Sequence, residues 1–297
     1  MTKEDILNKL EQDIRLRGLS EDTVTEYHTK ARVFMEHFGK PADQMGEAEF
    51  REFLRYLQEE RKLSPSSINT YNSGLRFLYE VTLEQNLNYK RIPRAKEPIL
   101  LPNIMTVKEV QKFCSSIDDL RYKAIFLTVY GSGLRLREIR HLRISDVDSE
   151  QMRLFIYQSK GKKDRFAVLS QISLAALREY WKAYRPNHPQ GYLFLNSNGT
   201  DCISDRAIQD AFAKYRDHAN LKCHATVHTL RHSYATHLLE SGISIFYIRQ
   251  LLGHSTIWTT TRYLHVANTD IMKTKSPLDT LNEKKKPGRP RKVTANG

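Results

Sequence analysis

Apolar residues recur every three or four positions in four successive runs of the first 86 residues, a spacing typical of amphipathic helices. Gly18 and Gly39 follow the first two runs, and glycine commonly ends a helix. Ser20 precedes the second run as a helix N-cap, and the pair Ser64-Pro65 opens the fourth. The pattern therefore predicts a small all-helical domain over residues 1–86, with helices near residues 6–14, 24–38, 50–57 and 68–78.

The helical pattern breaks between residues 87 and 104. The stretch YKRIPRAKEPILLP contains three prolines and several basic residues. A proline lacks the backbone N–H that a helix needs, so a proline-rich stretch favours extended chain. We expect residues 87–104 to form an extended linker between domains, whose positive charge would let it follow a phosphate backbone.

Residues 105–282 mix helical and strand patterns. Helices are expected from Thr106, over the apolar run that ends in the glycines near residue 133, and over 134–142. Two short segments, RLFIYQ and RFAVLS, flank the basic turn SKGKKD, which predicts a β-hairpin. Further helices are expected over 174–184, 205–218, 229–241 and 245–251. The whole pattern predicts a mainly α fold with a small β-sheet, in which an α+β second domain follows the helical first domain.

The chain ends in a charged tail over residues 283–297, EKKKPGRPRKVTANG, which is too polar to build a core. Its KPGRPRK segment has the Gly-Arg-Pro centre of an AT-hook, which would place Arg289 in the minor groove of A·T-rich DNA. A solvated basic tail fits the same residues equally well.

The balance of charges indicates a polyanionic partner. The chain has 297 residues, with 47 Lys and Arg against 34 Asp and Glu, and a formal net charge of +13. A protein this basic usually binds a polyanion, and basic residues spread among aromatics favour nucleic acid over an anionic membrane surface. The length is comfortable for two domains.

Other features indicate a cytoplasmic protein. No apolar run approaches the roughly 20 residues of a membrane span, and the N-terminus lacks the apolar core of a signal peptide. The three cysteines lie far apart and form no CxxC pair, which disfavours a disulfide framework and a zinc ribbon. We therefore expect no membrane association and a reducing, cytosolic setting.

Several separate motifs carry residue types suited to phosphate chemistry. His228 and Arg231 share one face of an expected helix because they are three positions apart. Tyr263 lies nine positions after His254. The candidates are Arg135 in GLRLREI, Lys160 in SKGKKD, His228 and Arg231 in HTLRH, His254 in LLGH, and Tyr263 in TTRYLHV.

Together these side chains could transfer a phosphodiester. Two arginines can hold the non-bridging oxygens of one phosphate and remain charged. A histidine can take the proton of a phenol, a lysine can protonate a leaving alkoxide, and a tyrosine can attack phosphorus. The phosphotyrosine ester keeps the energy of the broken bond, so rejoining would need no ATP. With two arginines neutralising the phosphate, no metal ion or other cofactor is expected.

The order Arg, Lys, His-x-x-Arg, His, Tyr resembles that of the tyrosine recombinases, which include phage integrases, Xer-type resolvases and integron integrases. The resemblance covers nearly all of the chain, to about residue 281. It implies a SAM-like core-binding domain over 1–86, a tyrosine-recombinase catalytic domain over 105–282, and cleavage of a specific double-stranded DNA site through a 3′-phosphotyrosine. It also implies a homotetramer that exchanges strands through a Holliday junction, and it allows an accessory DNA-bending or directionality factor.

The resemblance assigns a role to each motif. It gives the phosphate clamp to Arg135 and Arg231, the bracing of the site to Glu138, the phenol proton to His228, a phosphate hydrogen bond to His254, the proton for the leaving oxygen to Lys160, and the nucleophile to Tyr263.

The basic turn leaves the identity of the acid open. Lys162 and Lys163 share the hairpin with Lys160, and any of the three could reach the site. The resemblance favours Lys160. In that case Lys162, Lys163 and Arg165 would contact DNA phosphates.

Three alternatives use the same residues. His228 and His232 are four apart and could bind zinc, but Thr229 stands where a zincin motif has glutamate, so His232 and His237 are expected to be structural hydrogen-bonding residues. A type IB topoisomerase has a related site, which the separate helical domain and the LLGH–Tyr spacing disfavour. A DNA-binding regulator would need no tyrosine at position 263.

Overall fold

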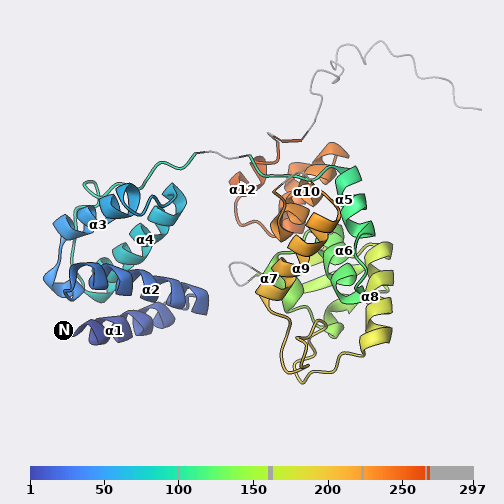
Figure 1. The fold of residues 1–297 in the computed structure, drawn as a ribbon, viewed down its shortest axis with the longest axis horizontal. Coiled ribbons are helices and arrows are strands. Elements are labelled where there is room, and N and C mark those ends of the chain that lie inside the picture. The colour runs from blue at the N-terminus through green and yellow to red at the C-terminus, as the bar shows by residue number, and fades with distance from the viewer. Residues whose placement is uncertain (99–100, 160–162, 222–223, 265, 268–297) are drawn as a thin grey trace, which may run out of the picture. The chain divides into compact units, whose positions relative to one another are not determined.

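The computed structural model describes residues 1–98, 101–159, 163–221, 224–264 and 266–267, without the side chains at positions 158, 159 and 163. The chain divides into two compact units, Met1–Ile99 and Leu100–Gly297 (Figure 1). Both units are mainly helical. The described part of the second unit contains a three-stranded sheet, so the predicted fold class is confirmed.

The first unit contains four α-helices, one over each of the four predicted apolar runs. The Ser20 hydroxyl accepts the Thr23 N–H at the start of the second helix, and Ser64 caps the fourth. Gly39 ends the second helix in the left-handed region, with φ 69°. The elements are α1 (Lys3–Leu16), α2 (Glu21–Phe38), the 3₁₀ turn η1 (Ala42–Gln44), α3 (Glu47–Glu59), α4 (Pro65–Phe77) and the π turn η2 (Leu78–Thr82).

The predicted domain boundary at residue 86 is too early, because residues 87–98 pack on the first unit. Ile92 is fully buried in the core of that unit. The Asn69 amide pairs with the Ala95 backbone in both directions at 2.9 Å, since Nδ2 donates to the carbonyl and Oδ1 accepts from the N–H. The Arg76 guanidinium donates to the Ile92 carbonyl at 2.6 Å. These side chains supply the hydrogen bonds that an extended segment otherwise lacks, so the segment is part of the domain.

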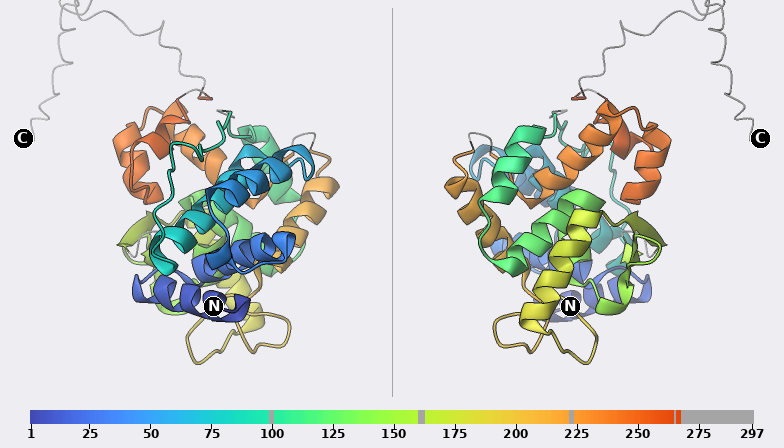
Figure 2. Two further views of the ribbon diagram at one scale, coloured as in Figure 1. Left: turned by 90° about the vertical axis from the view of Figure 1, so that its left-hand side faces the viewer. Right: turned by 90° about the vertical axis from the view of Figure 1, so that its right-hand side faces the viewer.

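In the second unit, helices pack against the face of the sheet that carries Leu154, Ile156 and Ala167, whereas Phe166 and Val168 on the other face are exposed. Helix α8 lies beside α6 (Figures 1 and 2). The predicted helix over 134–142 is shorter than expected, because Leu134 and Arg135 form the turn that precedes it. The elements are α5 (Val107–Ser115), α6 (Leu120–Ser132), α7 (Leu136–Arg140), the 3₁₀ turn η3 (Ile144–Asp146), β1 (Val147–Asp148), β2 (Arg153–Ser159), β3 (Lys163–Val168), α8 (Gln171–Tyr184), α9 (Asp205–His218), α10 (Val227–Glu240), α11 (Ile245–Leu252) and α12 (Trp258–Thr261).

The sheet is antiparallel, in the order β1-β2-β3. The predicted hairpin is confirmed as β2 and β3, with Ile156 opposite Arg165 and Leu154 opposite Ala167. Arg165 and Ala167 are two residues apart, so they share a face of the sheet, and Ala167 is buried. The sheet therefore directs Arg165 toward the interior of the unit. The strand β1 was not predicted, because two residues are too few for an alternating pattern.

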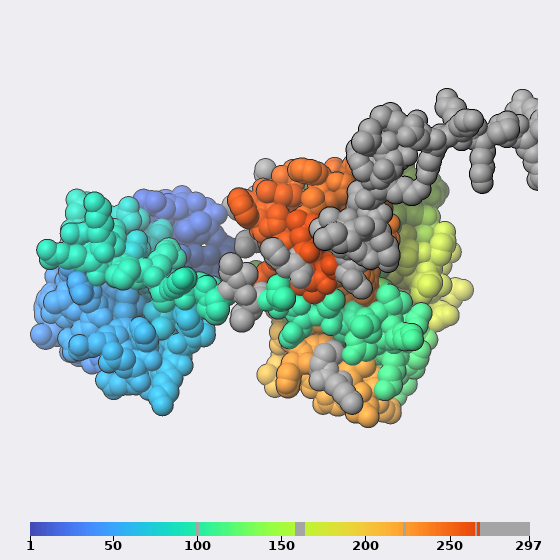
Figure 3. Space-filling model, turned by 90° about the horizontal axis from the view of Figure 1, so that it is seen from above, coloured from blue at the N-terminus to red at the C-terminus, as the bar shows by residue number. Residues whose placement is uncertain are grey.

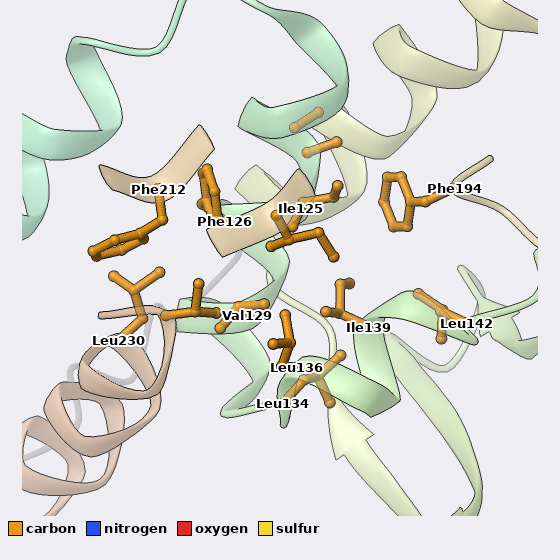
Figure 4. Packing of buried hydrophobic residues seen from close by; sticks show 14 of the residues in the cluster. Ile125, Phe126, Val129, Leu134, Leu136, Ile139, Leu142, Phe194, Phe212 and Leu230 are labelled. Carbon is orange, nitrogen blue, oxygen red and sulfur yellow. The ribbon is translucent and has the colours of Figure 1, made fainter. Parts of the chain in front are cut away.

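Helix α6 is central to the second core. Its Phe126 packs against Phe212 of α9, with ring centroids 5.5 Å apart, and Val129 belongs to the same buried cluster as Leu230 of α10 (Figure 4). The helix ends at Gly133, whose φ is 62°. A Cβ at this position would lie 2.5 Å from the Tyr234 ring, so only glycine fits. The end of α6 therefore lies directly against α10.

The start of the second unit is attached to α10. The backbone N–H of Met105 donates to the Ser233 hydroxyl of α10 at 2.7 Å. Figure 3 shows the red residues that follow α11 on the surface of this unit, next to green residues from its start. None of the helices in the described part of the chain combines the length and the apolar character that a bilayer crossing requires.

Candidate active site

Arg135 and Glu138 form the first part of the site at the start of α7. Arg135 is the N-cap residue, and Glu138 at the third helical position accepts its backbone N–H at 2.8 Å. The same carboxylate also accepts a hydrogen bond from Nη1 of Arg135 at 2.6 Å. The Glu138 side chain is 7% exposed and that of Arg135 is 21% exposed. A local helix cap thus fixes the orientation of an arginine that still reaches the surface.

Arg165 occupies a different place from the one that the sequence indicated. We expected it to contact DNA phosphates, but its side chain is only 8% exposed. Its Nη1 and Nη2 atoms donate to the two oxygens of Glu138, at 3.1 and 2.9 Å. Its Nε donates to the Leu251 carbonyl at 3.0 Å. In the described structure Arg165 supports Glu138 from β3, and this burial does not favour the direct phosphate contact that the sequence predicts.

Arg231 is the most buried arginine of the described site, with a side chain 4% exposed. From α10 it donates to the carbonyls of Gly133 at 2.5 Å and Leu252 at 2.7 Å, and it lies 3.8 Å from Glu138. Burial, together with the nearby Arg135, lowers the pKa of Arg231 to about 9. Arg231 therefore remains positively charged at neutral pH.

The C-terminus of α11 joins these arginines through its backbone. The last carbonyls of a helix lack partners within the helix and carry its negative dipole end, so they attract cations. Gly253, in the left-handed region with φ 63°, turns the chain away and leaves these carbonyls accessible. Each of three successive carbonyls accepts a hydrogen bond from a different arginine. The Leu251 carbonyl accepts one from Arg165 at 3.0 Å. The Leu252 carbonyl accepts one from Arg231 at 2.7 Å, and the Gly253 carbonyl accepts one from Arg135 at 3.1 Å.

His254 follows this helix end, and its two ring nitrogens have different partners. Nε2 lies 3.1 Å from Nη2 of Arg231, and Nδ1 lies 2.8 Å from the Thr260 hydroxyl. Because a guanidinium can only donate, Nε2 accepts, and the ring proton of neutral His254 lies on Nδ1. Burial and the positive charge of Arg231 lower the pKa of His254 to about 3, so the neutral ring predominates. To donate to a phosphate, Nε2 would have to gain a proton. The Thr260 hydroxyl allows this change of tautomer, because it can donate as well as accept.

Tyr263 lies just beyond α12 and is 1% exposed. It belongs to a small apolar cluster with Tyr234 of α10 and Leu252 of α11. Its ring lies nearly parallel to that of His254, at 15° and 6.5 Å between centroids. Desolvation raises the pKa of the Tyr263 phenol, and the nearby Arg231 opposes that shift. The phenol is therefore protonated at neutral pH and must lose a proton before it can attack.

The two histidines of the HTLRH motif are differently placed. His228 has an exposed ring, and no hydrogen bond of this ring lies within the described part of the chain. Partial burial and Arg231 lower the pKa of His228. His232 Nδ1, by contrast, lies 2.9 Å from the Tyr263 hydroxyl. The phenol that we expected to interact with His228 therefore contacts His232, which sequence reasoning had treated as structural. His237 has the structural role expected of it and bonds the Tyr130 hydroxyl at 2.9 Å.

The remaining candidates lie outside the described structure. Lys160, Lys162 and Arg289 are among the residues that are not described, and the side chain of Lys163 is likewise outside the description. Their roles stay predictions. Among the described residues, no three side chains of His, Cys, Asp or Glu gather in a group that could hold a metal ion.

The described site can hold an anion close to the Tyr263 phenol. The Glu138 cluster, with Arg135, Arg165 and Arg231, carries a formal charge of +2. A cavity of about 710 Å³ opens beside it between β3 and α11, and its lining includes Arg165, Gly253 and His254. A positive, partly buried site of this kind stabilises negative charge that develops on a phosphate during attack.

Comparison with known proteins identifies the family of the chain. Residues 103–270 match the phage integrase family, and residues 6–89 match the phage integrase N-terminal SAM-like domain. The Sinorhizobium fredii protein y4qK, provisionally named an integrase/recombinase, is 37% identical over 274 residues, which cover 92% of this chain and 88% of that protein. The tyrosine recombinase XerA of Pyrococcus horikoshii is 33% identical over 264 residues, which cover 88% of this chain and 89% of that protein.

Solved structures share the fold. A lambda integrase(75–356) dimer bound to a COC′ core site matches with a TM-score of 0.68 at 18% identity, covering 87% of this chain and 97% of that chain. A crystal structure of XerA recombinase matches with a TM-score of 0.54 at 22% identity, covering 96% of this chain and 100% of that chain. The chain belongs to the phage integrase family and is a tyrosine recombinase, an enzyme that cuts and rejoins DNA at specific sites.

Proposed function

We propose that Tyr263 is the nucleophile of this recombinase and attacks a DNA phosphodiester to give a 3′-phosphotyrosine and a free 5′-hydroxyl. The observation that carries the proposal is the convergence of Arg231 on α10, His254 after α11 and Tyr263 after α12. His254 contacts both other side chains, and the charge of Arg231 acts on the Tyr263 phenol. A tyrosine that served only to pack the core would need no buried arginine beside it.

The arginines would bind the scissile phosphate. Arg135 and Arg231 are held by backbone carbonyls and by Glu138, so their guanidinium groups need little rearrangement when the substrate arrives. His228, exposed next to them, would add a hydrogen bond to the phosphate, and His254 would add another after its change of tautomer. Charge that develops on the phosphorane would then meet fixed positive groups, which supports a reaction without a metal ion.

The atoms of the cleavage step balance without a cofactor. The bond from the Tyr263 oxygen to phosphorus forms as the bond from phosphorus to the 5′ oxygen breaks. The phenol gives its proton to a base, and Lys160 gives a proton to the 5′ oxygen. The new ester keeps the energy of the old one, so the reverse reaction rejoins the strand without ATP.

The proposed assembly is a homotetramer on two DNA duplexes that carry a specific recombination site. Lys162 and Lys163 would contact phosphates near the β2–β3 turn, and Arg289 would lie in a minor groove. An accessory DNA-bending or directionality factor would select the direction of the reaction. The net charge of +13 supports this extended contact with DNA. We place the enzyme in the cytoplasm, with its DNA, as part of a mobile element.

Covalent trapping tests the proposal. The protein is mixed with a duplex of its site that carries a bridging 5′-phosphorothiolate, in EDTA, and the products are run on a denaturing gel. We expect a DNA-linked band from the wild type and none from Tyr263→Phe. The control is Tyr130→Phe, which also removes a hydroxyl bonded to an α10 histidine and should leave the band unchanged. If the wild type binds the site yet forms no adduct, the chain acts as a DNA-binding regulator instead.

A further inference from the structure

The hydroxyl of Tyr263 has one described hydrogen-bond partner, and it is a histidine outside the expected site. His232 Nδ1 lies 2.9 Å from this hydroxyl. The two rings are tilted by 51°, with centroids 5.7 Å apart, so they are not stacked. A contact of this length between a phenol and an imidazole suits proton transfer.

We propose that His232 is the base that takes the Tyr263 proton during attack on DNA, and that His228 serves the phosphate. This inference rests on the proposed role of Tyr263 as nucleophile. His228 and His232 are one turn apart on α10, so both project to the same side of the helix. His228, nearer the N-terminus of the helix, is exposed to solvent, whereas His232 is half-buried and hydrogen-bonded to the Tyr263 hydroxyl. One helix thus supplies a phosphate ligand and a base from positions i and i+4.

The charges around His232 keep it ready to accept a proton. Burial, Arg262 beside the nucleophile, and His228 and Arg231 on its own helix lower the pKa of His232 to about 4. The ring is therefore neutral at physiological pH. If Nε2 carries the ring proton, the Nδ1 lone pair accepts the Tyr263 O–H.

The same charges link the proton transfer to the arrival of DNA. In the free protein, an imidazolium at position 232 would be repelled by Arg231 and Arg262. A bound phosphodiester adds a negative charge, and the phosphorane adds another, so the imidazolium becomes favourable as the bond to phosphorus forms. The O–H bond of Tyr263 breaks, its proton moves to Nδ1, and the proton returns to the phenol when the strand is rejoined.

A purely structural hydrogen bond predicts different behaviour, and the protein supplies a matched example. His237, on the same helix as His232, has its Nδ1 atom 2.9 Å from the Tyr130 hydroxyl. The residue types and the distance match those of the His232–Tyr263 pair. Tyr130 has no role in the proposed reaction. His237→Ala therefore removes an equivalent hydrogen bond without touching the nucleophile.

The test measures single-turnover adduct formation on a 5′-phosphorothiolate duplex between pH 6 and 9. Sulfur leaves without protonation, so the substrate bypasses Lys160 and isolates the activation of the nucleophile. We expect His232→Ala to slow adduct formation by about 10²–10⁴-fold near pH 7, with DNA affinity unchanged. The difference in rate between His232→Ala and the wild type should become smaller as the pH rises, because hydroxide then removes the phenol proton. His237→Ala should follow the wild type.

His232→Asn separates orientation from proton transfer. Its Oδ1 can accept the Tyr263 O–H near the position of Nδ1, but an amide cannot hold the proton. We expect the Asn variant to keep the thermal stability of the wild type and to keep the pH-dependent deficit of the Ala variant. The inference is overturned if both His232 variants form adduct at the wild-type rate, or if their deficit is the same at every pH. Absence of adduct from the wild type would instead overturn the proposed function.

Discussion

Glu138 joins three arginines into one rigid cluster. Desolvation alone would raise the pKa of this buried carboxyl, yet Arg165 and Arg135 hold it below its ordinary value. Arg165 approaches with both Nη atoms, in the paired geometry that a guanidinium and a carboxylate prefer. In the described structure Arg165 is thus paired with Glu138, which in turn holds Arg135.

Arg165→Gln tests this role at the residue scale. The change removes two charge-assisted hydrogen bonds to the buried Glu138 carboxylate and one to the Leu251 carbonyl, so we expect the free energy of unfolding to fall by about 3 kcal/mol or more. Arg153→Gln is the control, because Arg153 pairs with Asp148 near the surface and its loss should cost at most about 1 kcal/mol. Urea denaturation measures both. If Arg165 contacted DNA phosphates instead, its replacement would spare stability and reduce the salt dependence of DNA binding.

At the scale of elements, two helix ends organise the site. The carbonyls at the end of α11 accept three arginines, and the carbonyl of Gly133 at the end of α6 accepts Arg231 as well. Both helices end in a left-handed glycine, Gly253 or Gly133. The glycines in the GSGLR and LLGH motifs thus have a structural role: each ends a helix at the point where its last carbonyls face the arginines.

A pair of glycine substitutions measures that role. Gly133→Ala would place a Cβ 2.5 Å from the Tyr234 ring, in addition to the strain of a positive φ. Gly39→Ala has a similar φ of 69° and no atom within 4 Å of its Cβ, so it should cost only about 1 kcal/mol of backbone strain. In urea denaturation, we expect Gly133→Ala to lower the free energy of unfolding clearly more than Gly39→Ala does. It should also slow covalent trapping, because Arg231 must move with the Gly133 carbonyl. Equal costs for the two variants would mean that the close packing at Gly133 is unimportant.

The sequence predicted those elements whose signals are local. Helix caps such as Ser20 and Ser64 lie within a few residues of the hydrogen bonds that they make, and both are confirmed. The packing of residues 87–98 was missed because Asn69 is 26 residues away from its partner Ala95. His232 was missed for the same reason, since its partner is 31 residues later. Arg165 offered a signal that was not used: it alternates with the small residue Ala167, which marks the inner face of β3.

At the scale of the whole molecule, each unit has its own hydrophobic core, and the described catalytic candidates all belong to the second unit. Their histidines differ in environment from those of the first unit. His232 and His254 lie among arginines, whereas His28 faces Glu11 and His37 packs against Tyr56. The two units should therefore respond differently to acid.

We expect the second unit to lose stability first as the pH falls from about 7.5 to 5. His232 and His254 have pKa values of about 4 and about 3 in the folded unit, against about 6.5 in an unfolded chain. Between these values the unfolded chain binds protons that the folded unit does not, so their contribution to stability is complete above about pH 6.5 and declines below it. Hydrogen exchange, corrected for the intrinsic effect of pH and read by mass spectrometry, resolves the two units in the intact chain. His232→Asn should reduce the pH dependence of the second unit alone, and an equal loss of protection in both units would contradict the low pKa values assigned to these histidines.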